Sequence, residues 1–159
     1  MTMSLARDPR WDHAMSAPRF SRIALSTIHG AVALTALLGG GAMILASVMP
    51  GPLDAIAVPG DYLEGSPFDG YLVPGILLAL VVGGSHALAL TAQLRRTPLA
   101  AFWSAVAAFG LLIWIFVQMI VIPFSALQLG YFAAGIAEAA LVLLSLGVLE
   151  SRHVGAAPR

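Results

Sequence analysis

Residues 99–122 read LAAFWSAVAAFGLLIWIFVQMIVI and contain no charged side chain. A transmembrane helix needs about 20 consecutive apolar residues to cross the hydrocarbon core, so this run is long enough to span a bilayer. Further apolar runs of sufficient length lie at about 23–49, 71–94 and 126–149. The sequence therefore predicts an all-α fold, a polytopic integral membrane four-helix bundle.

The composition also indicates a membrane protein. Apolar residues make up 59% of the 159 residues and charged residues only 10%, whereas a soluble domain has about 25% charged residues. The formal net charge is zero, so nothing suggests a nucleic-acid partner. Cysteine is absent, which excludes disulfides, thiolate metal sites and cysteine catalysis.

The basic residues predict the orientation in the membrane. All eight are arginines, and they fall before the first run, between the second and third runs, and after the fourth: Arg7, Arg10, Arg19, Arg22, Arg95, Arg96, Arg152 and Arg159. The positive-inside rule places such segments in the cytoplasm. Arginine without lysine and abundant alanine fit a GC-rich bacterial genome. We therefore expect a multi-pass protein of the bacterial plasma (inner) membrane, with both termini cytoplasmic.

The apolar runs divide the chain into three parts. We expect a cytoplasmic N-terminal arm at 1–22, a four-helix transmembrane domain at 23–149 and a cytoplasmic tail at 150–159. Residues 50–70 form the expected outer loop, whose charged residues are all acidic: Asp54, Asp61, Glu64 and Asp69. These acids lack the alternating ligand spacing of a calcium loop, so we expect them to be solvated.

Short motifs predict where three of the helices begin. Ser125 is followed three residues later by Gln128, the pattern of a capping box. Ser66 and Thr97 each precede a proline, the pattern of a cap followed by the first helical position. They predict the starts of the second and third helices.

Small residues recur at intervals of four in the expected helices. The positions expected to pack helices together are Gly75, Ala79, Gly83 and Ala87 in the second run, Gly30 and Gly40 in the first, and Ala134 in the fourth. Helices in lipid associate through close packing and polar contacts, which small residues allow. The same stripes also drive homo-oligomers, and the sequence leaves both interpretations open.

Three ionisable side chains are expected inside the membrane: His29, His86 and Glu138. An ionised acid at this depth costs at least about 2.5–3.5 kcal/mol, so Glu138 is expected to face protein. Counting about 1.5 Å per residue from the inner ends of the runs places all three in the inner half of the bundle, where they can meet.

Several interpretations of these three residues stay open. They can bind a proton, a divalent metal ion or a cationic substrate, because imidazole and carboxylate are good ligands and histidine titrates near physiological pH. Alternatively, each side chain only hydrogen-bonds across helices, which stabilises membrane proteins by about 0.6 kcal/mol. We expect no bound cofactor, with a divalent metal ion or a bis-histidine haem at His29 and His86 as the alternatives.

Two resemblances can be stated. The layout of four spans, with Tyr71-Leu72-Val73-Pro74-Gly75 after the long loop and Trp114-Ile115-Phe116-Val117-Gln118 late in the third span, resembles small uncharacterised bacterial inner-membrane proteins. That resemblance covers about residues 22–152 and implies no activity. In size and in its single buried glutamate the chain is also similar to small multidrug-resistance transporters. Their essential glutamate lies in the first helix, whereas Glu138 lies in the fourth. We therefore do not infer their transport activity for this chain.

The leading expectation for function is non-enzymatic. No nucleophile elbow or glycine-rich phosphate loop is present, so no catalytic residue is assigned. We expect an accessory or structural subunit that lies in the lipid bilayer and packs against a membrane protein or a second copy of itself. The alternative is a proton-linked small transporter or ion pathway that uses Glu138, His29 and His86.

Overall fold

The computed structural model describes residues 9–49, 51 and 60–147. Within these residues the chain is helical and has no β-strand, which confirms the predicted all-α fold. The elements are α1 (Pro9–Val48), the 3₁₀ helix η2 (Gly60–Leu63), α2 (Leu72–Leu77), the π-helix η3 (Leu78–Gly84), α3 (Ser85–Leu94), α4 (Ala100–Val121) and α5 (Ala126–Ser145). Because α2, η3 and α3 follow one another without a break, they form one rod, called here the α2–α3 rod.

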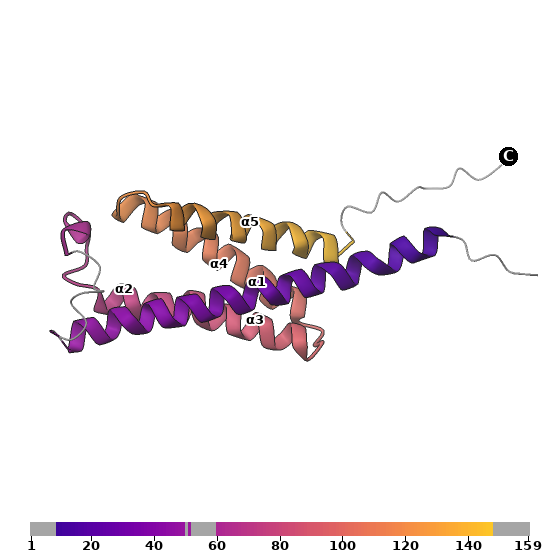
Figure 1. Cartoon of the computed structure of the whole chain (residues 1–159), viewed down its shortest axis with the longest axis horizontal. Coiled ribbons are helices and arrows are strands. Elements are labelled where there is room, and N and C mark those ends of the chain that lie inside the picture. The colour runs from indigo at the N-terminus through magenta and orange to yellow at the C-terminus, as the bar shows by residue number, and fades with distance from the viewer. Residues whose placement is uncertain (1–8, 50, 52–59, 148–159) are drawn as a thin grey trace, which may run out of the picture.

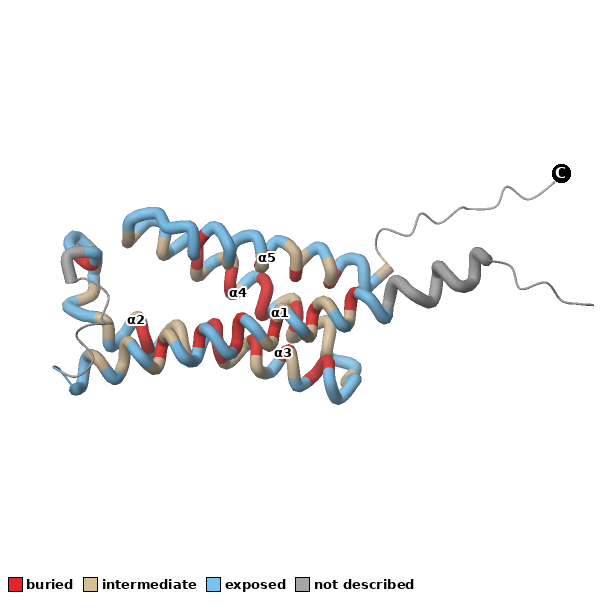
Figure 2. The backbone as a smooth tube through the Cα atoms, viewed as in Figure 1, coloured by how far each residue is buried: buried red, intermediate tan, exposed pale blue. Residues whose placement is uncertain are grey.

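The helices are long and apolar enough for the predicted membrane spans. In the described part of the chain, four stretches could cross a bilayer by length and composition: Arg19–Val48, Leu72–Leu94, Ala100–Val121 and Ala126–Ser145. Figure 2 shows exposed residues along each long helix. Many of these exposed residues have large apolar side chains. Such a surface suits lipid far better than water.

The expected arm, outer loop and tail are described only in part. Residues 1–8 of the arm, residues 50 and 52–59 of the loop, and the whole tail at 150–159 lie outside the described residues. In the described part of the arm the chain is already helical, because α1 begins at Pro9.

The four long elements form a closed ring. Helix α1 packs against α5 and the α2–α3 rod, and α4 packs against the same two neighbours. Figure 1 shows the start of α1, the α3–α4 turn and the end of α5 at one end of the bundle, called here the terminal end. Residues 60–71 and the α4–α5 turn lie at the opposite end, called here the loop end.

The predicted capping box at the start of α5 is confirmed. The Ser125 hydroxyl accepts a hydrogen bond from the Gln128 backbone N–H at 3.3 Å, and Gln128 Oε1 accepts one from the Ser125 N–H at 2.9 Å. The pair satisfies two N–H groups that a helix start leaves without partners.

The other two predicted helix starts are wrong. Helix α2 begins at Leu72, because the Ser66 hydroxyl accepts the Phe68 N–H at 3.2 Å and closes a local turn instead of capping a helix. Helix α4 begins at Ala100, with Leu99 at the N-cap position and no side-chain cap, and Thr97 belongs to the end of α3 instead. The Thr97 N–H donates to the Ala92 carbonyl at 3.1 Å in a Schellman motif whose left-handed residue is Arg96, with φ of 52°.

Glycines bring the backbones of α1 and the α2–α3 rod into direct contact near the loop end. A Cβ added to Gly40 would lie 2.6 Å from the carbonyl oxygen of Gly75 and 2.9 Å from the Ala79 Cβ. A Cβ added to Gly83 would lie 2.9 Å from the Leu37 side chain. Three of the positions singled out for packing, Gly40, Gly75 and Gly83, thus leave no room for a larger residue.

The remaining small positions pack less tightly. A Cβ on Gly30 would be 3.8 Å from Leu90, an ordinary contact, and Ala87 is half-buried. Ala134 packs against the core cluster of Val32, Ala36, Val82, Leu111 and Ile115. Its neighbour Gly135 packs more tightly, because an added Cβ there would lie 2.8 Å from the Leu112 side chain on α4.

The Gly40 contact can be tested against the adjacent glycine. We expect Gly40→Ala to lower the free energy of unfolding by about 1–3 kcal/mol, the usual effect of overpacking, because the backbone of the rod must move away. Gly41→Ala adds the same methyl group to the same helix where nothing lies within 4 Å. It should leave stability unchanged or slightly higher, as judged by thermal unfolding in detergent. Equal stability of the two variants would contradict the contact.

Candidate functional site

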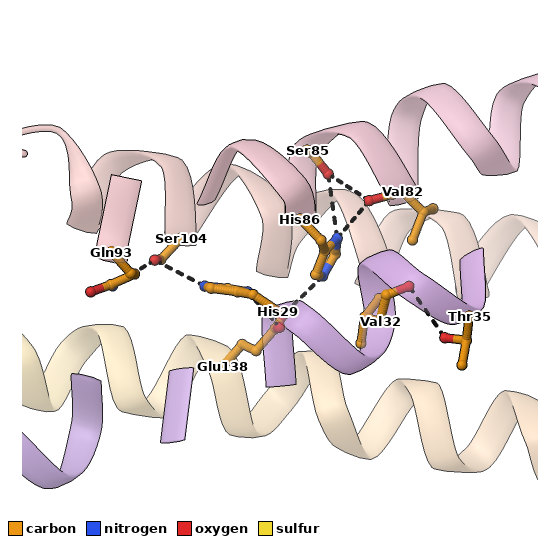
Figure 3. Close-up of polar contacts among 9 residues, drawn as sticks. All are labelled: His29, Val32, Thr35, Val82, Ser85, His86, Gln93, Ser104 and Glu138. Atoms are coloured by element: carbon orange, nitrogen blue, oxygen red, sulfur yellow. Dashed lines mark hydrogen bonds and ion pairs between the residues drawn. The ribbon is translucent and has the colours of Figure 1, made fainter. Parts of the chain in front are cut away.

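Glu138, His29 and His86 come together in the centre of the bundle. Glu138 lies on α5, His29 on α1 and His86 on α3, and each is 0% exposed. The structure therefore joins the three ionisable residues that the sequence placed at similar depth. They are called here the Glu–His cluster, and Figure 3 shows their contacts.

Each carboxyl oxygen of Glu138 faces one imidazole. Oε1 lies 2.9 Å from Nδ1 of His29, and Oε2 lies 3.3 Å from Nε2 of His86. The two rings have centroids 5.6 Å apart and stand at 72° to each other. Glu138 thus bridges the two histidines.

His86 is held on its other side by the backbone. Its Nδ1 lies 2.7 Å from the carbonyl oxygen of Val82, one turn earlier in the π-helix η3. The Ser85 hydroxyl donates to the same carbonyl at 3.1 Å. π-Helical turns are rare and often occur at functional sites.

These contacts place one proton between His86 and Glu138. A carbonyl oxygen only accepts hydrogen bonds, so Nδ1 of His86 carries a hydrogen and donates it to Val82. Nε2 of a neutral ring is then an acceptor, as is an ionised carboxylate, and two acceptors cannot bond. The contact between them forms when either the ring or the carboxyl carries one further proton, which the two groups share.

The hydrogen-bonded network continues from His29 toward the terminal end. Nε2 of His29 lies 3.0 Å from the Ser104 hydroxyl, which also accepts a hydrogen bond from the Gln93 amide nitrogen at 2.9 Å. Neither Ser104 nor Gln93 was expected from the sequence. Both are polar residues in apolar runs, one on each side of the α3–α4 turn, and their polarity was the available signal.

The network connects two hollows at opposite ends of the bundle. Val82 lines a cavity of about 370 Å³ at the loop end. Gln93 lines an open groove at the terminal end, together with Arg22, Ile23, Ser26, Thr27, Leu90, Leu94 and Arg96. The members of the network between Val82 and Gln93 are fully buried: His86, Glu138, His29 and Ser104. A chain of hydrogen bonds therefore runs through the core from a residue that lines one hollow to a residue that lines the other.

The same cluster could hold a metal ion. His29, His86 and Glu138 each offer one ligand atom, and these atoms all lie within 4.8 Å of one another. Two histidines and one glutamate form a ligand set that zinc accepts in proteins. A bis-histidine haem needs a flat cavity between the two rings, whereas here the Glu138 carboxyl bridges them.

The shared proton makes a specific prediction for stability. The substitution Glu138→Gln keeps an oxygen that accepts from His29 and adds an N–H that donates to His86. The free energy of unfolding of Glu138→Gln should therefore lie within about 1 kcal/mol of the wild-type value. Glu138→Leu leaves buried ring nitrogens unpaired and should lose about 2–4 kcal/mol. Thermal unfolding in detergent measures both. If Glu138→Gln were as unstable as Glu138→Leu, the hydrogen-bond assignment would be wrong.

Comparisons of this chain with known protein families, with curated proteins and with solved structures give no match. The chemistry of the site is therefore inferred from its own geometry. A buried acid bridges two imidazoles, and hydrogen bonds connect this cluster to Val82 and Gln93, which line hollows at opposite ends of the bundle.

Proposed function

We propose that this protein is a multi-pass membrane protein that conducts protons through its bundle, with Glu138 and His86 as the central proton-binding pair. The observation that supports this function best is the network joining the cavity near Val82 to the groove at Gln93. An ionisable group inside a membrane span is a functional candidate by default, because its burial is costly.

Glu138 can pass a proton to a ring on either side. When the hydrogen of a neutral His29 is on Nε2, the proton that Oε2 shares with His86 can reach Oε1 by rotation of the carboxyl group and pass to Nδ1 of His29. His29 then gives its Nε2 hydrogen to the Ser104 oxygen, and Ser104 releases its own hydroxyl hydrogen toward the groove. The contacts from His86 to Glu138, from Glu138 to His29 and from His29 to Ser104 join atoms 2.9–3.3 Å apart.

Both ends of this path are closed. Ser104 is fully buried, whereas Gln93, which donates to it, is 7% exposed and lines the groove. An amide nitrogen only donates, so Gln93 holds Ser104 in place but passes no proton. A proton can therefore pass between Ser104 and the groove only when the Gln93 side chain moves away from Ser104. At the other end, Val82 separates His86 from the cavity.

We place the terminal end of the bundle in the cytoplasm of a bacterial cell and the loop end outside. Arg22 and Arg96 line the groove at the terminal end, and Arg95 lies in the adjoining turn. The positive-inside rule supports this orientation. On this placement, the path leads from the outer cavity through the Glu–His cluster to the cytoplasmic groove.

Proton flux into sealed vesicles tests the proposal. Wild-type protein in liposomes, with valinomycin and potassium to remove the opposing voltage, should collapse an imposed pH gradient faster than empty liposomes. Glu138→Gln should reduce the rate to that of empty liposomes, because an amide neither takes up nor releases a proton at this site. Pyranine fluorescence inside the vesicles reports the rate.

Glu64→Gln is the matched control, since Glu64 is exposed in the turn after η2. This substitution should leave the flux unchanged. A wild-type rate equal to that of empty liposomes would refute the proton pathway. The Glu–His cluster would then serve helix packing, as expected for an accessory subunit that binds a membrane protein or a second copy of itself.

A divalent metal ion is the second candidate occupant, supported by the convergence of three ligand atoms within 4.8 Å. Zinc would bind through the lone pairs that hold the shared proton, so metal and proton would compete. On this assignment, micromolar Zn²⁺ should raise the Tm of wild type but not that of Glu138→Gln. An equal rise in both proteins would place the zinc elsewhere on the chain.

A further inference from the structure

The cavity at the loop end, where the proposed proton path begins, also has the character of a small-molecule site. It measures about 370 Å³, within the range of roughly 300–1,000 Å³ typical of ligand pockets. Its walls come from α1, the α2–α3 rod, α4, α5 and the segment 62–71. Most of the lining is apolar or aromatic, and none of the described residues that line it is charged. Among these lining residues a charged ligand would therefore find no counter-ion.

Two hydrogen-bond donors of lining residues lack partners. Within the described residues, the Trp114 Nε1 and the Gln128 Nε2 are buried and donate a hydrogen bond to no neighbour. Gln128 is only 3% exposed. Its amide orientation is fixed by the capping box, because Oε1 accepts the Ser125 N–H, so the unpartnered end is the –NH₂ group. A buried donor without an acceptor destabilises the fold.

We propose that this cavity binds an apolar carbonyl compound whose oxygen atoms accept hydrogen bonds from Trp114 and Gln128. Both unpartnered groups only donate, so a ligand that pairs with them must supply acceptors, as carbonyl oxygens do. The uncharged, apolar walls favour a neutral, hydrophobic body around those oxygens. A membrane supplies this chemistry in two forms, the ester of an acyl lipid and the carbonyl of a free quinone or ketone.

The test uses tritiated menadione, a neutral quinone, and methylnaphthalene, its hydrocarbon counterpart without an acceptor. Wild-type protein in nanodiscs of ether-linked lipid, which has no ester carbonyl, should bind menadione above the level of empty nanodiscs. Trp114→Phe removes the N–H donor together with the pyrrole part of the indole, and it should weaken menadione binding roughly 3- to 10-fold more than methylnaphthalene binding, the effect of one hydrogen bond. Methylnaphthalene binding measures the effect of the smaller ring alone and shows that the cavity is intact.

Trp103→Phe is the matched control, because Trp103 is absent from the cavity lining. This variant should bind menadione as wild type does. Glu138→Gln should also bind menadione normally, so failure of the proton pathway would not affect this result. Nanodiscs of ester lipid then distinguish the two sources: weaker menadione binding there identifies the lipid ester as the natural occupant, and unchanged binding identifies a free carbonyl compound. No menadione binding by wild type in ether lipid, or equal menadione affinity in wild type and Trp114→Phe, would overturn the proposal.

Discussion

A backbone carbonyl can accept a hydrogen bond but never donate one, and the chemistry of the Glu–His cluster depends on this constraint. Because the Val82 oxygen takes the Nδ1 hydrogen of His86, the opposite ring nitrogen can meet Glu138 only through an added proton. The His29 side is not constrained in this way, since Ser104 can either donate or accept. Glu138 therefore stands between one fixed and one adjustable partner, an arrangement suited to moving a proton in steps.

Two kinds of contact hold the four helices together, and they lie at different levels of the bundle. Lipid tails are as apolar as the helix surfaces, so burial alone gives little drive for association in a membrane. Toward the loop end, Gly40 and Gly75 let two backbones touch. Deeper in the bundle, the polar network of His29, His86, Ser104 and Glu138 links α1, the α2–α3 rod, α4 and α5. The residues of the candidate site are thus also part of what positions the helices around it.

The sequence predicted the helical class and the four apolar helices because those depend on the length and polarity of each run. It also placed His29, His86 and Glu138 at similar depth, since helical rise is constant. It could not predict which nitrogen faces which oxygen, because that depends on the rotation of each helix about its axis. The helix starts predicted at Ser66 and Thr97 were wrong for another reason. A short polar side chain can close a turn, and a backbone N–H can end the preceding helix, as readily as either can begin a new one. The close approach at Gly135 likewise follows from helix rotation.

The shared proton also decides the electrical state of the bundle. With one proton between Glu138 and His86, the Glu–His cluster has no net charge, whichever group holds it. Removing that proton leaves one negative charge in the low-dielectric core, and adding another leaves one positive charge. On the proposed membrane placement, each such charge lies within the transmembrane field, where a full crossing is worth about 2.3 kcal/mol per 100 mV. The voltage across the membrane would therefore act directly on the occupancy of the cluster, with no separate voltage-sensing segment.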